Sequence, residues 1–101
     1  MAYAELNFLG ILNRGGRTKI GEPLIRGLDK IKLLYVATDA KGSLKEDMLR
    51  KAKNERIVVI EFFSKEQLGS SIGYSEVAYL GVTDKKAAVK LIEIHGKETA
   101  S

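Results

Sequence analysis

The stretch "LLYVA", residues Leu33–Ala37, decides the fold. Successive side chains of a strand point to opposite faces, and in this run the side chains of both faces are apolar. A strand formed by it would therefore be apolar on both faces. Such strands are usually buried between two layers of helices. Two further runs, "RIVVIEFF" (Arg56–Phe63) and "VAYLGV" (Val77–Val82), share this composition, which favours strands. The pattern predicts a sheet covered by helices on both sides.

Helical patterns separate these runs. Ser43–Asn54 begins with a predicted capping box between Ser43 and Glu46. Its side chains are expected to form the ion pairs Glu46–Arg50 and Asp47–Lys51, and its apolar face is expected to comprise Leu44, Met48, Leu49 and Ala52. Ser64–Ile72 repeats the capping device, with Ser64 and Gln67 as the predicted partners, Leu68 and Ile72 facing inward and Gly73 as the stop.

The last helix is predicted to begin after Asp84 as its cap and to end at His95–Gly96, leaving residues 97–101 as a frayed tail. Its core-facing residues are predicted to be Ala88, Leu91 and Ile92. Upstream of "LLYVA", we expect a helix over Glu5–Asn13, a short edge strand over Arg17–Ile20, and a helix over Glu22–Leu28 with Pro23 in its first turn. Helices and strands thus alternate, which indicates one three-layer α/β/α domain with four strands over residues 1–96.

Composition excludes several kinds of site. The 101 residues contain no cysteine and one histidine, which excludes disulfides, thiolate zinc sites, a cysteine nucleophile and any site with several histidines. We therefore expect no metal and no cofactor. The first residues resemble no secretory signal and no segment approaches the length of a membrane span, so the expected location is the cytoplasm, with no membrane partner.

The net charge of +4 is unevenly distributed. Residues 1–32 contain six cations against three carboxylates, and "NRGGRTKIGEPL" (Asn13–Leu24) holds Arg14, Arg17 and Lys19 among three glycines. The stretch lacks the spacing of a P-loop and of a dinucleotide-binding glycine motif. Its cations, and the backbone amides at the start of the helix near Glu22, favour contacts with the phosphates of RNA or DNA. A solvated basic turn is the alternative interpretation.

The candidate catalytic residues have simpler structural explanations. Helix capping and ion pairing account for Glu46 and Asp47, and Glu22 and Asp29 lie among exposed cations. His95 is predicted in the last helical turn, where a cation complements the helix dipole. No nucleophile, base and orienting group can be assembled, so we do not expect an enzyme.

The order of these motifs resembles the bacterial YlxQ-type relatives of the kink-turn-binding ribosomal proteins (the L-seven-Ae family). The resemblance covers roughly residues 5–94 and rests on four segments: "NFLGILNRGGR" (Asn7–Arg17), "KIKLLYVATDA" (Lys30–Ala40), "SKEQLGSSIG" (Ser64–Gly73) and "VAYLGVTD" (Val77–Asp84). It implies an α/β/α sandwich with a mixed sheet that binds structured RNA, a kink-turn or a related ribosomal or regulatory RNA, in company with ribosome-associated proteins.

The resemblance also implies which residues bind RNA, in two segments and their basic flanks. The first segment is Gly21, Glu22, Pro23 and Leu24, flanked by Arg17 and Lys19, and the second is Tyr74, Ser75, Glu76 and Val77. Lys30 and Lys32 lie where the family usually has basic residues, and Arg14 belongs to the same basic stretch.

The chain departs from the family pattern at the first segment. Pro23 stands where the family usually has a polar residue that reaches the tandem G·A pairs, and Gly27 stands where it has a lysine. Arg26 is the nearest replacement, one position away and so rotated by about 100° on the helix. The segment before Lys30 is also about three residues short. These departures predict weaker and less selective readout of the kink-turn, with phosphate contacts retained.

Two other functions remain open. The domain could be a protein–protein interaction module that has kept the fold and lost RNA binding, with an apolar patch around Leu24, Tyr74 and Val77. It could also serve as the RNA-recognition partner of a separate RNA-modifying enzyme.

Overall fold

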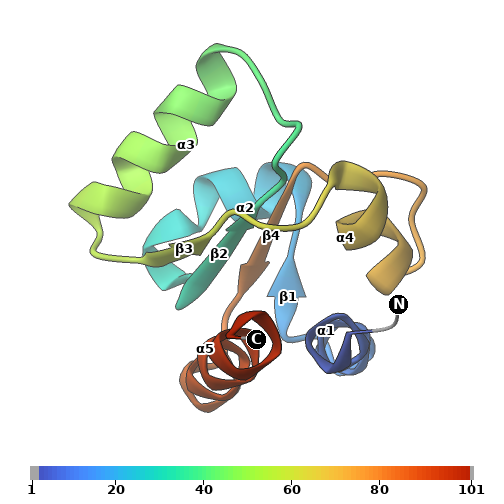
Figure 1. The fold of residues 1–101 in the computed structure, drawn as a ribbon. Coiled ribbons are helices and arrows are strands. Elements are labelled where there is room, and N and C mark those ends of the chain that lie inside the picture. The colour runs from blue at the N-terminus through green and yellow to red at the C-terminus, as the bar shows by residue number, and fades with distance from the viewer. Residues whose placement is uncertain (1–2, 101) are drawn as a thin grey trace.

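The computed structural model describes residues 3–100 and shows a mixed α/β fold (Figure 1). Its elements alternate along most of the chain: α1 (Ala4–Arg14), β1 (Thr18–Lys19), α2 (Gly21–Arg26), a 3₁₀ turn η1 (Leu28–Lys30), β2 (Leu33–Val36), α3 (Ser43–Asn54), β3 (Val58–Ile60), α4 (Lys65–Ser71), β4 (Tyr79–Val82) and α5 (Lys85–Thr99).

The four strands form one mixed sheet in the order β1-β4-β2-β3. Strand β4 is antiparallel to both of its neighbours, and β2 and β3 are parallel. Thr18 at the start of β1 and Leu33 at the start of β2 both pair with Val82 at the end of β4. The segments that precede β1 and β2 therefore reach the same end of the sheet as the start of α5.

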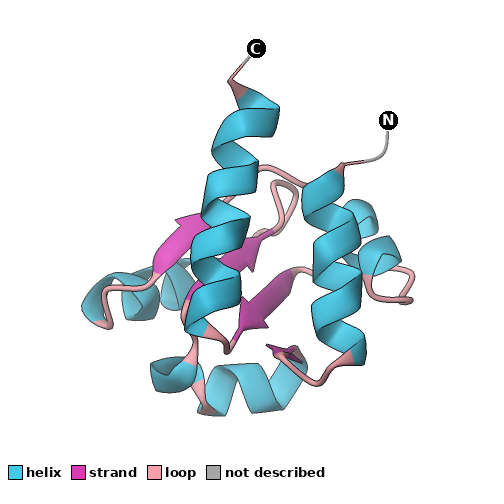
Figure 2. Ribbon diagram, turned by 90° about the horizontal axis from the view of Figure 1, so that it is seen from below, coloured by secondary structure: helices cyan, strands magenta, loops and turns pink. Residues whose placement is uncertain are grey.

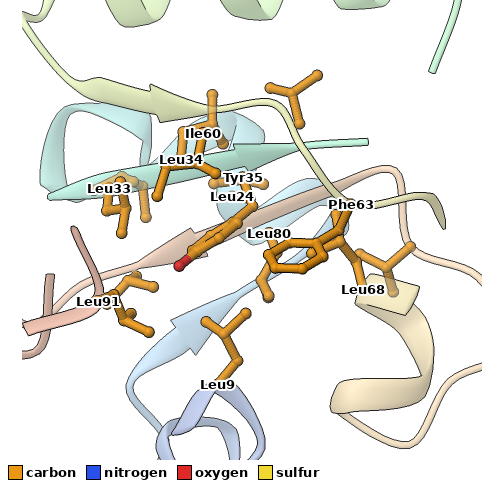
Figure 3. Close-up of a cluster of buried hydrophobic side chains, with 14 of the residues drawn as sticks. Leu9, Leu24, Leu33, Leu34, Tyr35, Ile60, Phe63, Leu68, Leu80 and Leu91 are labelled. Atoms are coloured by element: carbon orange, nitrogen blue, oxygen red, sulfur yellow. The ribbon is translucent and has the colours of Figure 1, made fainter. Parts of the chain in front are cut away.

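Helices cover both faces of the sheet, which confirms the three-layer architecture. Helices α1 and α5 lie side by side beneath the sheet (Figures 1 and 2), where Leu9 and Leu91 point into the core (Figure 3). Side chains alternate between the two faces of a strand, and Leu24 of α2 lies against Gly81 on the other face. All four residues of β2 are buried, as the apolar "LLYVA" run predicts.

The strands are shorter than the apolar runs. Strand β3 keeps only three residues of the predicted Arg56–Phe63, because Arg56 adopts a left-handed conformation with φ of 57° and the chain leaves the sheet after Ile60. Strand β3 is also an edge strand, which leaves Val58 half-exposed. A continuous apolar run therefore overestimates the length of a strand that pairs on one side only.

The predicted cap of α4 is confirmed, and the predicted cap of α3 is wrong. Ser64 and Gln67 form the complete reciprocal capping box. At α3, however, the N-cap is Gly42, whose φ of 92° turns the chain, and Ser43 is the first helical residue with no capping hydrogen bond. The glycine takes the cap position because only a residue without Cβ adopts this conformation readily.

Two further corrections concern α3 and α5. Arg50 pairs with Asp47 rather than Glu46, whereas Lys51 pairs with Asp47 as predicted. Leu44 and Ile92 are exposed rather than in the core. The apolar pattern of a helix does not show how much of its apolar face the neighbouring elements cover.

Helix α5 continues to Thr99, past the predicted end at His95–Gly96, so residues 97–99 of the expected tail are helical; Ser101 lies outside the described residues. The carboxylate of Glu98 accepts the N–H groups of Ala4 (2.9 Å) and Glu5 (3.1 Å) at the start of α1. A long-range tertiary contact thus keeps the last turn in place. No helix over residues 3–100 is long and apolar enough to cross a bilayer.

Candidate nucleic-acid interface and a buried polar cluster

Four of the sequence-predicted RNA-binding residues meet at one surface hollow beside α2. The hollow has a volume of about 620 Å³. Its lining comprises Lys19, Pro23, Arg26, Gly27, Asp29, Lys30 and Thr83. We call this surface the α2 edge. Its three cations against one carboxylate give it the charge that a phosphate backbone attracts.

The predicted cations differ in how far they are already paired. Arg17 forms an ion pair with Asp84 (2.9 Å), and Arg26 forms one with Glu22 (3.1 Å). Within residues 3–100, none of the other predicted cations, Arg14, Lys19, Lys30 and Lys32, lies within ion-pair distance of a carboxylate, and all four are exposed. These four are free to meet an anionic partner.

Helix α2 itself is smaller than the sequence suggested. It begins at Gly21, with φ of 63°, and ends at Arg26, and Leu28 belongs to the following 3₁₀ turn. Six residues align few peptide dipoles, so the expected pull of backbone amides near Glu22 on phosphates is weak. Any attraction for phosphates at the α2 edge comes mainly from side chains.

The predicted site is wrong at Leu24 and Val77 as exposed contacts, because both side chains are buried in the core. The apolar patch expected around Leu24, Tyr74 and Val77 is therefore absent, and only Tyr74 is exposed. A direct contact from Leu24 or Val77 to RNA could come only from the backbone. From the sequence alone, a leucine or valine at these positions fits the core and the surface equally well, because burial depends on which elements pack against it.

The second predicted segment is held against α4. The N–H of Tyr74 donates to the carbonyl of Gly69 (2.8 Å), and that of Val77 donates to the carbonyl of Lys65 (3.0 Å). Tyr74, Ser75 and Glu76 are exposed. In the described part of the chain no hydrogen bond or ion pair joins this loop to Gly21–Arg26, so its relation to the α2 edge is not set by a direct contact.

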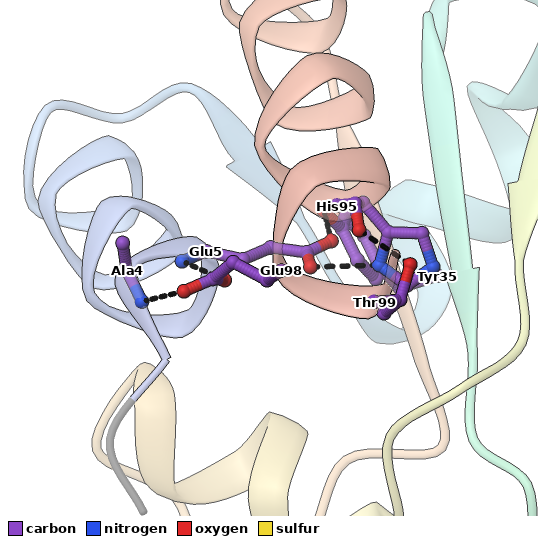
Figure 4. Close-up of polar contacts among 6 residues, drawn as sticks. All are labelled: Ala4, Glu5, Tyr35, His95, Glu98 and Thr99. Atoms are coloured by element: carbon purple, nitrogen blue, oxygen red, sulfur yellow. Dashed lines mark hydrogen bonds and ion pairs between the residues drawn. The ribbon is translucent and has the colours of Figure 1, made fainter. Parts of the chain in front are cut away.

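A buried cluster that the sequence analysis missed joins α1, β2 and α5 (Figure 4). Glu5 is fully buried. Its Oε2 accepts the hydroxyl of Tyr35 (2.6 Å), and its Oε1 lies 2.8 Å from Nδ1 of His95. The rings of Phe62 and Phe63 lie edge-on to His95, with centroids 5.2 and 6.2 Å away. The only signal in the sequence was a carboxylate on the apolar side of an amphipathic helix.

Burial raises the pKa of Tyr35 far above its ordinary value, and the hydrogen bond to Glu5 raises it further. The hydroxyl is therefore a fixed donor at neutral pH. Each buried polar atom of the cluster has a hydrogen-bond partner, and within residues 3–100 no buried side-chain nitrogen or oxygen lacks one. Its geometry ties three elements together across 30 and 90 positions of sequence.

Residues 3–100 contain no grouping of histidine, aspartate and glutamate that could hold a metal ion. No family model and no curated protein matches the chain. Among solved structures, a protein of unknown function from Bacillus halodurans is similar, with 25% identity and a TM-score of 0.84. The match covers 92% of this chain and 97% of that one. The likeness extends over the whole domain and establishes the fold.

Proposed function

We propose that the protein is a non-catalytic binder of structured RNA that contacts the phosphate backbone through the α2 edge. The observation that carries the proposal is the convergence of Lys19, Arg26 and Lys30 on one hollow. Lys32 follows closely in the chain, where its N–H donates to Val82 at the end of β4 (2.7 Å). The resemblance of four ordered motifs to the kink-turn-binding ribosomal proteins supports the same function.

The composition of the α2 edge also predicts how the RNA is bound. Pro23 has no side-chain donor and no backbone N–H, so it cannot read base edges by donating a hydrogen bond. The carboxylates of Glu22 and Glu76, in the two predicted segments, are exposed and would repel nearby phosphates. Lysine contacts to phosphates are strong at low salt and insensitive to sequence. Binding should therefore be salt-sensitive and only modestly selective for a kink-turn.

The test is a titration of the full chain against a kink-turn RNA and a plain duplex of equal length at about 50 and 200 mM salt. We expect both RNAs to bind at the lower salt, with affinity falling steeply at the higher salt. The double variant Lys19→Ala/Lys30→Ala should bind more weakly. Its salt slope should fall by about two, because each of the two lysines is expected to neutralise one phosphate.

Lys41→Ala is the matched control, because Lys41 is an exposed lysine beyond the opposite end of β2. It should leave both affinities nearly unchanged. No binding of either RNA at the lower salt would refute RNA binding. An equal loss of affinity for Lys41→Ala and the double variant would refute the α2 edge as the site. A kink-turn preference that survives the higher salt would show that Gly21–Leu24 reads the bend directly.

A further inference from the structure

Helix α1 presents an apolar residue on a ridge between two hollows. Ile11 is 54% exposed and lines both of them. The hollow between α1 and α5 measures about 520 Å³, with Phe8, Leu12 and Ala87 among its lining residues. The hollow between α1 and α4 measures about 540 Å³ and is more polar, with Gln67, Ser70 and Ser71 of α4 opposite Leu6. We call Ile11 and these two hollows the α1 ridge.

Cations outnumber carboxylates along the α5 side of this surface. Arg17, Lys86 and Lys90 line the hollow on the α5 side, and Arg14 lines the one on the α4 side. The carboxylates in the same linings are Asp84 and Glu66. Asp84 is already engaged, since it pairs with Arg17 and caps α5 through the N–H of Lys86 (3.1 Å). Because that pair engages Arg17 as well, and Glu66 offsets Arg14, the positive excess of the α1 ridge comes from Lys86 and Lys90 on its α5 side.

Helix α1 is a rigid base for such a surface. Gly10 lies so close to α4 that a Cβ built on it would be 2.6 Å from the carbonyl oxygen of Ser71. Glu98 caps the start of the helix, and Glu5 fixes it to β2 and α5. A surface held in this way loses little conformational entropy when a partner binds.

We propose that the α1 ridge binds an acidic amphipathic helix of a partner protein. Apolar side chains at i, i+3 and i+4 of that helix would pack on Ile11 and fill the hollow on the α5 side, and its carboxylates would meet Lys86 and Lys90. The eleven residues of α1 span about 16 Å, which matches three turns of a partner helix. RNA fits this surface less well because an exposed isoleucine offers nothing to phosphates. A second copy of the chain would place the same two lysines face to face.

The inference is independent of the α2 edge, because none of the residues lining that hollow lines either hollow of the α1 ridge. The probe is a synthetic, fluorescently labelled peptide of about 16 residues, with leucines at i, i+3, i+4 and i+7, four glutamates beside them and helix-favouring alanines elsewhere. A second peptide has the same leucines with lysine in place of glutamate. Binding to the full chain is followed by anisotropy, and the surface is located by backbone amide shifts.

We expect saturable binding of the acidic peptide alone, with shifts centred on α1 and the start of α5. Ile11→Glu should weaken it at least tenfold, and Lys86→Glu/Lys90→Glu should do the same. Leu44→Glu is the matched control, because Leu44 is an exposed leucine on α3, across the sheet from α1. It should leave the affinity unchanged, and Ile11→Glu should leave RNA binding unchanged.

Three results would overturn the proposal. The first is the absence of saturable binding by the acidic peptide. The second is equal binding of the lysine peptide, which would remove the charge argument. The third is amide shifts located away from α1 and α5. None of these results affects the RNA titration, so failure of this inference and failure of the proposed function are distinguishable.

Discussion

The start of α1 and the α2 edge place ionisable residues in opposite situations. On α1, Glu5 is fully buried and each of its carboxylate oxygens has a partner. At the α2 edge, Lys19 and Lys30 are exposed and have no carboxylate within ion-pair distance among the described residues. A buried carboxyl group whose two oxygens both have partners holds elements together, whereas exposed unpaired charges add little to stability and remain available to a ligand. The buried cluster therefore contributes to stability, whereas the exposed lysines of the α2 edge are available to a ligand.

The largest effect expected on the α1 side comes from Glu5→Ala. The substitution leaves a cavity and removes the acceptor of the Tyr35 hydroxyl and of His95. The free energy of unfolding should fall by about 3–4 kcal/mol, measured by urea denaturation. RNA affinity of the folded fraction should not change. A loss below about 1 kcal/mol would show that the cluster does not anchor α1.

Gly10→Ala tests the close approach of α1 and α4. The new Cβ would meet the carbonyl oxygen of Ser71, a backbone atom that cannot move alone. We expect the free energy of unfolding to fall by about 2–3 kcal/mol. Gly96→Ala is the matched control, since this glycine lies in α5 with no atom within 4 Å of a built Cβ. It should stabilise the protein by up to about 1 kcal/mol. Equal effects of the two substitutions would contradict the tight packing.

Tyr35→Phe sharpens the comparison further, because it removes one hydroxyl and keeps the ring. Loss of the hydrogen bond to Glu5 should lower the free energy of unfolding by about 2 kcal/mol at neutral pH. In the wild type the pKa of Tyr35 is raised, so above pH 10 the unfolded chain releases this proton while the folded chain keeps it. Stability should therefore fall by about 1.4 kcal/mol per pH unit there. The variant should show a shallower alkaline slope, and identical slopes would argue against the buried hydroxyl.

The smallest effect on stability is expected at the α2 edge. Lys19→Ala/Lys30→Ala should change the free energy of unfolding by no more than about 0.5 kcal/mol per site. Thermal and urea unfolding of this variant and of Lys41→Ala should coincide within that range. A large destabilisation would mean that these lysines have structural partners, and the contrast between the buried cluster and the α2 edge would then fail.

Much of the fold follows from local patterns. Strand β2 is buried on both faces because "LLYVA" has no polar position. Ser64 with Gln67 and Asp84 cap the helices that they were predicted to cap, because a cap depends on residues within one turn. The length of β3 was wrong because a neighbour in space decides it, since this strand pairs on one side only. The cap of α3 was wrong for a local reason, the positive φ of Gly42 beside Ser43.

The candidate site shows the same division. Clustering of cations near α2 was visible in the sequence because most of these residues lie within twenty positions of one another. The burial of Leu24 and Val77 was not visible, because an apolar residue beside a binding loop fits the core and the surface equally well. The apolar ridge at Ile11 was missed since its exposure depends on how α4 and α5 flank α1.

The amino-acid sequence by itself determined the order of helices and strands, the double-sided burial of β2, two of the helix caps and the basic character of the α2 edge. These properties depend on contacts within a few residues, which composition and periodicity record directly. Only the tertiary structure decided that Glu5 would meet Tyr35 and His95, that Glu98 would cap α1 and extend α5, and that Ile11 would remain uncovered. Those outcomes join residues 30 to 94 positions apart, or depend on how whole helices pack, and no local pattern encodes such geometry.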